Sequence, residues 1–279
     1  MFLIKKLEML GRRFLLWLCG HLLAVSAGRS MEKLDRIAVV RLDPRVGNLI
    51  LLTPLLTSLK LRFPHAQIDV VVHHGSAVLL ENHAAINQLI PFNKKTLFGQ
   101  NGVFPVWTSL RRGKYDLMID ASNPTFPSTT QALMVRFSKS RYTTGVGLKG
   151  IGKIFTHPVL IEEDESSHEI DLRLQLLEYV PGTAQSRDVS LGESILKTTP
   201  PQQTSPYAIL NLGARLKNKQ LSAKTYAKIA KCIADKGHPV LLTYGPKELA
   251  LAQETQALCN QAKLAPPTTL EELAVLMSQ

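Results

Sequence analysis

The chain has 279 residues, 45% of them hydrophobic and 20% charged, a composition that supports a buried core and excludes a disordered chain. At about 150 residues per domain, this length suggests two domains. The three cysteines are far apart and form no C-x-x-C pair, which argues against a disulfide scaffold or zinc ribbon and favours a reducing compartment. No apolar run reaches the roughly 20 residues of a membrane-spanning helix.

The net charge of +11 is concentrated in two short segments. Residues 1–30 carry a net +4, and residues 215–236 carry a net +6. A net positive charge concentrated in two short segments, in a chain with only 6% aromatic residues, does not resemble a nucleic-acid-binding surface. We therefore expect anionic partners but no nucleic acid.

Residues 1–35 form a basic amphipathic N-terminal segment. Its polar positions recur seven residues apart, at Lys5/Lys6, Arg12/Arg13 and Gly20/His21, with apolar residues between them. This spacing is typical of a helix that lies on an anionic membrane surface. Two alternatives stay open: a helix packed on its own domain, and a secretory signal peptide whose apolar run is followed by small residues.

Residues 36–180 alternate strand-like and helix-like stretches. Strands are predicted over 36–42, 68–73, 88–92 and 115–121. Helices are predicted over 49–63, 77–85, 105–113, 128–139 and 166–180, the last opening with the capping box Ser166-x-x-Glu169. The alternation predicts an α/β domain in which helices cover both faces of a parallel sheet.

Residues 181–206 hold four prolines and many small polar residues, which is typical of a linker between domains. A second α/β unit follows over 207–279. It has predicted strands over 207–213 and 239–244, and helices over 222–236, 246–262 and 269–277. Because this unit is much shorter than the first, we expect an incomplete second domain.

The loop after the first strand, Asp43-Pro44-Arg45-Val46-Gly47-Asn48, precedes a helix. Ligands of open α/β sheets bind beyond the carboxyl ends of strands, and helix N-termini favour anions. Gly47 permits close approach of a ligand, and Asp43 is a candidate base. The alternative is an ordinary glycine-containing turn. His73-His74 ends the second strand and is either an acceptor-facing pair or a solvated turn.

The second unit contains two similar loops. In Asn211-Leu212-Gly213-Ala214-Arg215-Leu216-Lys217-Asn218-Lys219, a glycine and several cations follow a strand, which suits a phosphate or diphosphate; a solvated basic face is the alternative. The loop Tyr244-Gly245-Pro246-Lys247-Glu248 also follows a strand and places Glu248 at a helix start, where an acidic residue is usual.

Together these segments resemble glycosyltransferase family 9, the ADP-heptose:lipopolysaccharide heptosyltransferases. Thr53-Pro54 and Arg62-Phe63-Pro64 resemble the family's opening, and YDLMIDA (115–121) its next recognisable strand. His168-Glu169-x-Asp171 resembles the stretch before its linker. Asn211, Gly213, Ala214 and Lys219 match its Asn-x-Gly-Ala and lysine, and 244–248 is similar to its Gly-Gly-Pro-x-Glu.

The resemblance implies two Rossmann-like domains of the GT-B type: an acceptor domain over 36–180 and a nucleotide-sugar-binding domain over 207–279. It implies inverting transfer of heptose from an ADP-sugar to the lipid A-linked core oligosaccharide, at the cytoplasmic face of the inner membrane. Lys219 would bind the donor phosphates and stabilise their leaving charge, while Glu248 contacts the ribose and Gly213 and Ala214 line the donor site. Gly47, His73 and His74 would face the acceptor. No cofactor and no metal are implied.

Two departures from the family pattern bear on activity. Asn48 stands where the family has its catalytic aspartate, and an amide cannot act as a general base. Asp43 is the candidate replacement. The chain also stops just short of the family's Asp-Ser/Thr-Gly-x-x-His segment, which leads us to expect a C-terminal truncation. These departures favour, as the alternative, a non-catalytic nucleotide-sugar-binding or scaffold protein. An unrelated nucleotide-binding α/β protein is a third reading.

Overall fold

The computed structural model describes residues 10–11, 14, 18, 30–124, 127–147, 154–161, 167–196, 206–214 and 216–278. Its residues form two compact units that divide the chain between Ser194 and Ile195. Most of the expected N-terminal amphipathic segment lies outside the described residues, as do Ser166 and Arg215. Among the described residues, no helix is both long enough and apolar enough to cross a bilayer.

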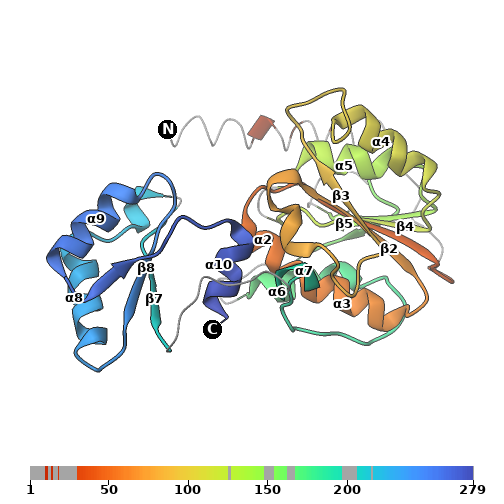
Figure 1. Ribbon diagram of the computed structural model, residues 1–279. Coiled ribbons are helices and arrows are strands. Elements are labelled where there is room, and N and C mark those ends of the chain that lie inside the picture. The colour runs from red at the N-terminus through yellow and green to blue at the C-terminus, as the bar shows by residue number, and fades with distance from the viewer. Residues whose placement is uncertain are drawn as a thin grey trace. The chain divides into compact units, whose positions relative to one another are not determined.

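Unit 1 is built on a six-stranded parallel sheet (Figure 1). Its strands are β1 (Arg36–Arg41), β2 (Gln67–His73), β3 (Gln88–Phe92), β4 (Leu117–Asp120), β5 (Tyr142–Val146) and β6 (His157–Val159). The order β3-β2-β1-β4-β5-β6, with every strand pair parallel, is that of a Rossmann sheet. The predicted α/β class with a parallel sheet is therefore confirmed for this unit.

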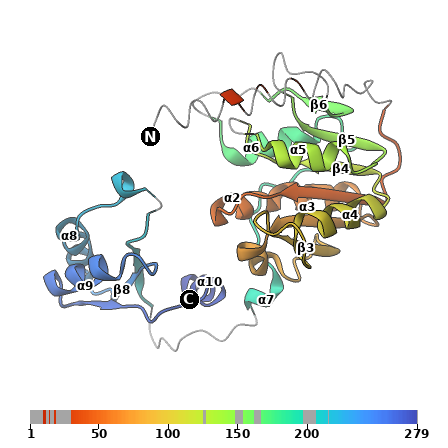
Figure 2. The same cartoon turned by 90° about the horizontal axis from the view of Figure 1, so that it is seen from above.

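Helices cover both faces of the sheet (Figure 2). They are α2 (Val46–Ile50), α3 (Thr53–Arg62), η1 (His74–Leu80), α4 (Val103–Arg112), α5 (Thr129–Arg136), α6 (Glu169–Leu174), η2 (Gln175–Leu177) and α7 (Glu193–Leu196). Successive residues of β1 point to opposite faces: Val39 packs in the cluster that contains Leu55 of α3, and Val40 in the cluster that contains Leu110 of α4. This alternation makes two buried layers.

Three expectations for local structure are wrong. The helix predicted over 49–63 is broken into α2 and α3, because Pro54 lies in the first turn of α3 and a proline favours a helix start. In the segment 77–85, residues 77–80 belong to the 3₁₀ helix η1 and the rest forms turns, where an α-helix was expected. The helix predicted from Ser166 begins at Glu169, where His168 is the cap and accepts a hydrogen bond from the Ile170 N–H.

Part of the predicted linker packs along unit 1. The Ser186 N–H donates to the Ser58 hydroxyl (2.9 Å), and the Ser190 N–H donates to the Thr53 hydroxyl (3.0 Å). Gly192 approaches so closely that an added Cβ would lie 2.0 Å from the Glu81 carbonyl oxygen. The first unit accordingly runs to Ser194.

Unit 2 has a three-stranded parallel sheet of order β7-β8-β9. Its elements are β7 (Ala208–Asn211), η3 (Lys217–Lys219), α8 (Ala223–Ala234), β8 (Val240–Thr243), α9 (Leu249–Leu258), β9 (Ala262–Leu264) and α10 (Leu270–Met277). Residues of α8 and α9 share a core with Leu242 of β8, whereas Leu276 of α10 packs with Leu241, which points to the opposite face. Unit 2 is thus also covered on both faces.

Candidate active site

The carboxyl ends of β1 and β4 are the natural place for a ligand in unit 1. The strand order reverses at this point, because the chain proceeds from β1 to β2 and β3 on one side and returns to β4 on the other. In open α/β sheets the crevice at such a switch point holds the ligand. The loops that begin at Leu42 and Ala121 meet there, since Arg41 bonds to the Ala121 carbonyl oxygen.

Asp43 is the centre of a hydrogen-bond network in the loop after β1. Its carboxylate accepts bonds from the Arg45 backbone N–H (2.9 Å), the Arg45 guanidinium (Nε, 2.9 Å) and the Asn48 amide (Nδ2, 2.7 Å). The Arg41 guanidinium (Nη2) lies 3.3 Å from the same carboxylate. The structure therefore brings together Asp43 and Asn48, the two residues singled out in this loop.

These contacts determine the protonation of Asp43. Burial, the largest single influence, raises the pKa, but the bonds from Arg45 and Asn48 and the charge of Arg41 outweigh it and lower the pKa to about 2. The carboxylate is consequently ionised throughout the neutral range and is a weak base. It also holds the Asn48 amide by its nitrogen, which leaves the amide oxygen as the available acceptor.

Two buried arginines lie beneath these loops, and the sequence analysis missed both. Arg41 and Arg173 are each only 1% exposed. Arg173 donates to the Ser122 carbonyl oxygen (2.9 Å) and to Glu169 (2.9 Å), and the Nε atom of each guanidinium has no partner among the described residues. Burial, together with the charge of Arg173, lowers the pKa of Arg41 to about 10, so Arg41 stays charged at neutral pH. Burial also lowers the pKa of Arg173.

The pair fixes the loops and makes the base of the site electropositive. A charged residue at the end of the apolar run RIAVVRL was the available signal for Arg41, since arginine is rarely buried without a role. Its partner Ala121 is 80 positions away, and that contact follows only from the pairing of β1 with β4.

A second buried polar group, Asp120, ends β4. Gln131 donates to its carboxylate (2.8 Å) and to the Val40 carbonyl oxygen (2.7 Å), and thereby joins α5 to both central strands. Burial raises the pKa of Asp120 to about 6, although bonds from Ser122 and Gln131 and the charge of Arg41 oppose the shift. Asp120 supports the Ser122 loop through a bond to its N–H (2.9 Å).

The predicted acceptor-side residues lie at the same edge of the sheet. Gly47 is in α2, exposed, and an added Cβ would meet nothing within 4 Å. His73 ends β2 next to β1; its ring accepts a bond from the Gly75 N–H and lies 4.6 Å from the His74 ring. Burial and the neighbouring His74 and Lys94 lower the pKa of His73, so the ring is neutral at pH 7.

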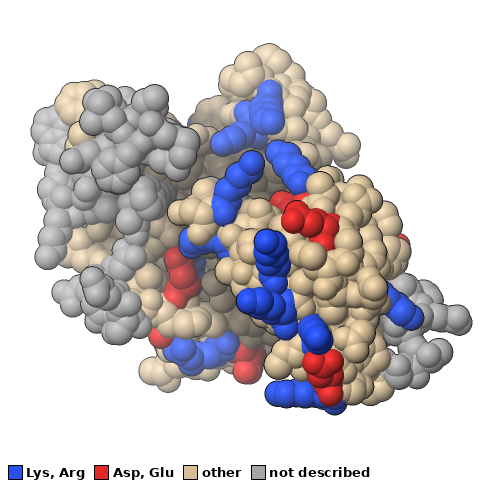
Figure 3. All heavy atoms as spheres, turned by 90° about the vertical axis from the view of Figure 1, so that its left-hand side faces the viewer, with Lys and Arg blue, Asp and Glu red and all other residues tan. Residues whose placement is uncertain are grey.

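In unit 2 the predicted donor-side residues follow β7 and β8, which are adjacent parallel strands. The Asn211 side-chain oxygen accepts bonds from the Gly213 N–H (3.3 Å) and the Thr243 hydroxyl (3.4 Å), which ties the two loops together. Ala214 follows, and Lys219 is exposed in η3. Figure 3 shows Lys and Arg side chains, with acidic ones between them, over the face that carries α8.

Glu248 lies at the start of α9, beside Gly245. A Cβ added to Gly245 would lie 2.6 Å from the Glu248 carboxylate oxygen, so only glycine lets this carboxylate fold back over the loop. The Glu248 side chain makes no cap bond to the helix, which leaves its oxygens available to a ligand. The structure thus places Gly213, Ala214, Lys219 and Glu248 in loops that follow two neighbouring strand ends.

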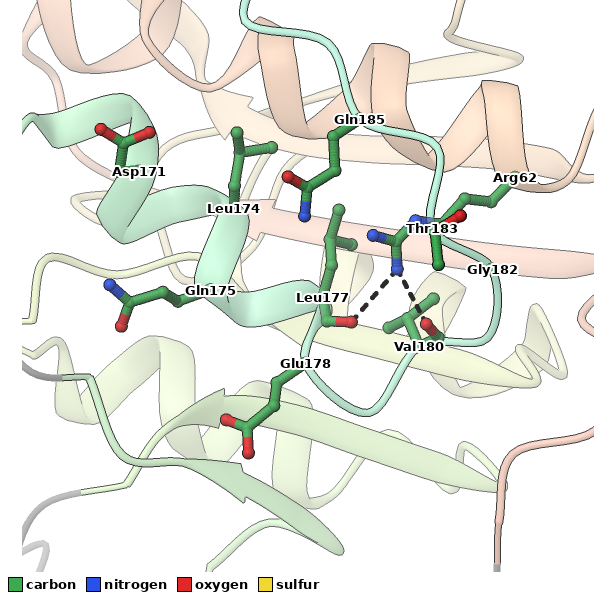
Figure 4. Close-up of a pocket in the computed structure, with 10 residues that line it drawn as sticks. All are labelled: Arg62, Asp171, Leu174, Gln175, Leu177, Glu178, Val180, Gly182, Thr183 and Gln185. Atoms are coloured by element: carbon green, nitrogen blue, oxygen red, sulfur yellow. Dashed lines mark hydrogen bonds between the residues drawn. The ribbon is translucent and has the colours of Figure 1, made fainter.

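Two other features of unit 1 are separate from this site. No cluster of three or more His, Cys, Asp or Glu suited to a metal occurs among the described residues. A cavity of about 570 Å³ lies beside Arg62, the last residue of α3, and is lined mainly by residues of α6, η2 and the segment that follows (Figure 4). There the Arg62 guanidinium donates to the carbonyl oxygens of Leu177 (3.2 Å), Val180 (2.8 Å) and Ala184 (2.9 Å), a structural role for the Arg62-Phe63-Pro64 motif.

Comparison with known proteins identifies the family. The sequence model of glycosyltransferase family 9 (heptosyltransferase) matches residues 103–279, which is more than half of the chain. The chain belongs to glycosyltransferase family 9. The match includes all of unit 2 from β7 onward, whereas the loop with Asp43 and Asn48 lies before the matched residues.

Individual relatives agree with this family. Lipopolysaccharide heptosyltransferase 3 of Escherichia coli K12 is 26% identical over 251 residues, which cover 83% of this chain and 71% of that protein. A family 9 glycosyltransferase of Veillonella parvula has a similar fold (TM-score 0.68, 21% identity, 90% of this chain and 74% of the other). So does the E. coli heptosyltransferase WaaC, solved with ADP-2-deoxy-2-fluoro heptose (TM-score 0.68, 19% identity, 87% and 80%).

Proposed function

We propose that this family 9 glycosyltransferase transfers heptose from ADP-heptose to the inner core of lipopolysaccharide, with inversion and by direct displacement. The family match over 103–279 carries the proposal, because it includes the whole donor-side set, Gly213, Ala214, Lys219 and Glu248. WaaC, with a similar fold, was solved with an ADP-heptose analogue, which supports the same donor class here.

On the donor side, the exposed Lys219 binds the diphosphate, and Glu248 accepts bonds from the ribose hydroxyls. A cation beside the diphosphate stabilises the negative charge that develops as the bond to the sugar breaks. Gly213 and Ala214 lie between the strand end and η3 and allow the backbone to approach the phosphates. No cofactor or metal is part of the proposed reaction; the nucleotide sugar is a substrate.

On the acceptor side, Asp43 is the residue that takes the proton. The acceptor hydroxyl oxygen forms the new bond to the anomeric carbon while the bond to the diphosphate breaks and ADP leaves with the electron pair. Because the hydroxyl becomes strongly acidic only as that bond forms, even a carboxylate with a pKa of about 2 accepts the proton late in the step. Asn48 binds the acceptor through its free amide oxygen and transfers no proton.

The acceptor also suggests a location. We propose that the enzyme works at the cytoplasmic face of the inner membrane, where residues 1–35 lie on the anionic surface as an amphipathic helix. Lipid A-linked core oligosaccharide is anchored in that membrane, so a peripheral enzyme gains access to it without a spanning helix. Removal of residues 1–30 is expected to shift the protein from the membrane fraction to the soluble fraction; retention on the membrane would contradict this role.

A specific observation also favours a second function. Asn48 has no basicity, and Asp43 is already engaged by Arg45, Asn48 and Arg41, which suits a protein that binds nucleotide sugar without turnover. Calorimetry with ADP-heptose and a turnover assay with lipid A-linked core separate the two. Turnover that Lys219→Ala abolishes and the matched surface change Lys224→Ala spares supports the enzyme. Binding without turnover supports the scaffold, and no binding refutes both.

A further inference from the structure

The loop between β3 and α4, with the outer face of α4, forms an exposed apolar surface. Leu97 is 56% exposed, Phe98 72% and Phe104 45%. The Phe98 and Phe104 rings stack with their centroids 5.2 Å apart, and with Pro105, Thr108, Ser109 and Arg112 they line a groove of about 470 Å³. We call Leu97, Phe98 and Phe104 the aromatic tip. Apolar side chains clustered in this way on a surface indicate a binding partner.

The aromatic tip is held in place by its own backbone. The Asn93 N–H donates to the Asn101 carbonyl oxygen (2.7 Å), and the N–H groups of Val103 and Phe104 donate to the carbonyl oxygens of Thr96 (2.9 Å) and Leu97 (3.1 Å). These bonds close the loop at its base. The loop thus presents Leu97 and Phe98 at the surface.

The sequence on either side of the tip carries basic residues and no acidic residue. From residue 82 to residue 115 the sequence contains no Asp or Glu, and its five basic residues are Lys94, Lys95, Arg111, Arg112 and Lys114. None of the five forms an ion pair with a described residue.

We propose that the aromatic tip and its cations dock on an anionic lipid bilayer. Apolar side chains that enter the interface and unpaired lysines and arginines that meet lipid phosphates are the two contributions that peripheral membrane proteins combine. The loop follows β3, and β3 is parallel to β1 and β2, so the tip leaves the sheet at the edge that carries Asp43 and His73. Docking through it turns this edge toward the bilayer. The proposal does not depend on the reaction proposed above.

The first test measures binding of the full-length chain to vesicles of phosphatidylcholine, with and without phosphatidylglycerol. The variant Lys94→Gln/Lys95→Gln/Arg112→Gln should bind the anionic vesicles up to about 100-fold more weakly, since each cation near such a surface contributes about fivefold. The control Lys224→Gln/Lys228→Gln/Lys231→Gln removes the same charge from α8 and should bind nearly as the parent does. Equal losses in both variants would show a mere net-charge effect and overturn the proposal.

The apolar part is tested in the same way. Leu97→Ser/Phe98→Ser/Phe104→Ser should lower binding by at least about tenfold, because exposed rings no longer enter the lipid. Its control changes three exposed leucines of unit 2, Leu221, Leu249 and Leu258, to serine. Circular dichroism and thermal unfolding verify that each variant is folded. If the tip variant binds vesicles as tightly as its control, or instead loses a dimer detected by light scattering, the bilayer is not the partner.

A direct readout separates the tip from the N-terminal segment. The chain has two tryptophans, so Phe98→Trp in a Trp17→Phe/Trp107→Phe background makes position 98 the sole indole. Brominated phospholipids should quench the fluorescence of this indole when the protein binds anionic vesicles. A bound protein whose indole fluorescence is unquenched would refute docking through the tip, whatever residues 1–35 do.

Discussion

The contact between Asn48 and Asp43 leads to a prediction for Asn48→Asp. In the native chain the Asn48 amide donates to the Asp43 carboxylate over 2.7 Å. The substitution replaces this bond with two carboxylates whose charge centres are about 4 Å apart, and at an effective dielectric constant of about 20 their repulsion is about 4 kcal/mol. That energy corresponds to about 3 pKa units.

The two carboxylates then titrate as a coupled pair. One keeps a low pKa through Arg45 and Arg41, and the other rises from an ordinary value near 4 to about 6 to 7. A base in that range accepts a proton from the acceptor hydroxyl far more readily than Asp43 does alone, so the variant should turn over faster, with an acid limb near pH 6 to 7 that the native chain lacks.

The assay is kcat/KM against pH, together with carboxyl-carbon NMR titration of the same variant, which does not require activity. The swap Asp43→Asn/Asn48→Asp is the control: it leaves one carboxylate, at the position where the family resemblance expects it, with no second charge to raise its pKa. If the carboxyl groups at 43 and 48 both titrate below pH 5 in the single variant, the two side chains are not paired and the reasoning fails.

Three further predictions concern single residues. Gly47→Ala should leave the free energy of unfolding unchanged or raise it by up to about 1 kcal/mol, since the new methyl group meets nothing. If the acceptor approaches the backbone at this position, the same change should lower kcat/KM, and unaltered kinetics would exclude that approach. Arg62→Ala should cost about 2 to 3 kcal/mol in urea unfolding, against less than about 1 for the exposed Arg187→Ala, and equal costs would contradict the anchoring role of Arg62. The pKa of Asp120 is about 6 in the folded chain, against about 4 in the unfolded chain. The contribution of Asp120 to stability is therefore fully present below pH 4, and about 3 kcal/mol of it is lost as the pH rises through 6. Asp120→Asn should abolish that slope, and a slope that persists would assign it to another group.

The sequence predicts the central strands of both units well, because β-branched runs such as RIAVVR and QIDVVVH are buried on both faces of a parallel sheet. It does not reveal β5, β6 or β9. The β5 segment YTTGV is polar and contains a glycine, yet it pairs with β4 and β6, and a Cβ added to Gly145 would lie 2.7 Å from the Phe155 ring. Tertiary packing there overrides local propensity.

The candidate site also has parts that the sequence predicts and parts that it does not. Residues within one loop, such as Asp43 with Asn48 or Gly245 with Glu248, were predictable because their spacing along the chain is short. The contacts of Arg41 and Arg173 with the Ala121 loop span 80 and 52 positions and depend on which strands are neighbours. The low pKa of Asp43 comes mainly from bonds donated by Arg45 and Asn48 within the same loop, with the charge of Arg41 added. Residue spacing along the chain does not reveal that these bonds converge on one carboxylate, so its weakness as a base could not be read from the loop sequence.

The segment that runs along α3 before Ser194 has a consequence for engineering the family. Its bonds to the Ser58 and Thr53 hydroxyls, and the close fit of Gly192 against Glu81, make it part of the first unit's surface. A chimaera that exchanges unit 2 between two members of the family should therefore be joined after α7, which ends at Leu196. A junction at 180, where the prolines and small polar residues suggest a linker, would place a foreign segment against α3 and is expected to destabilise unit 1.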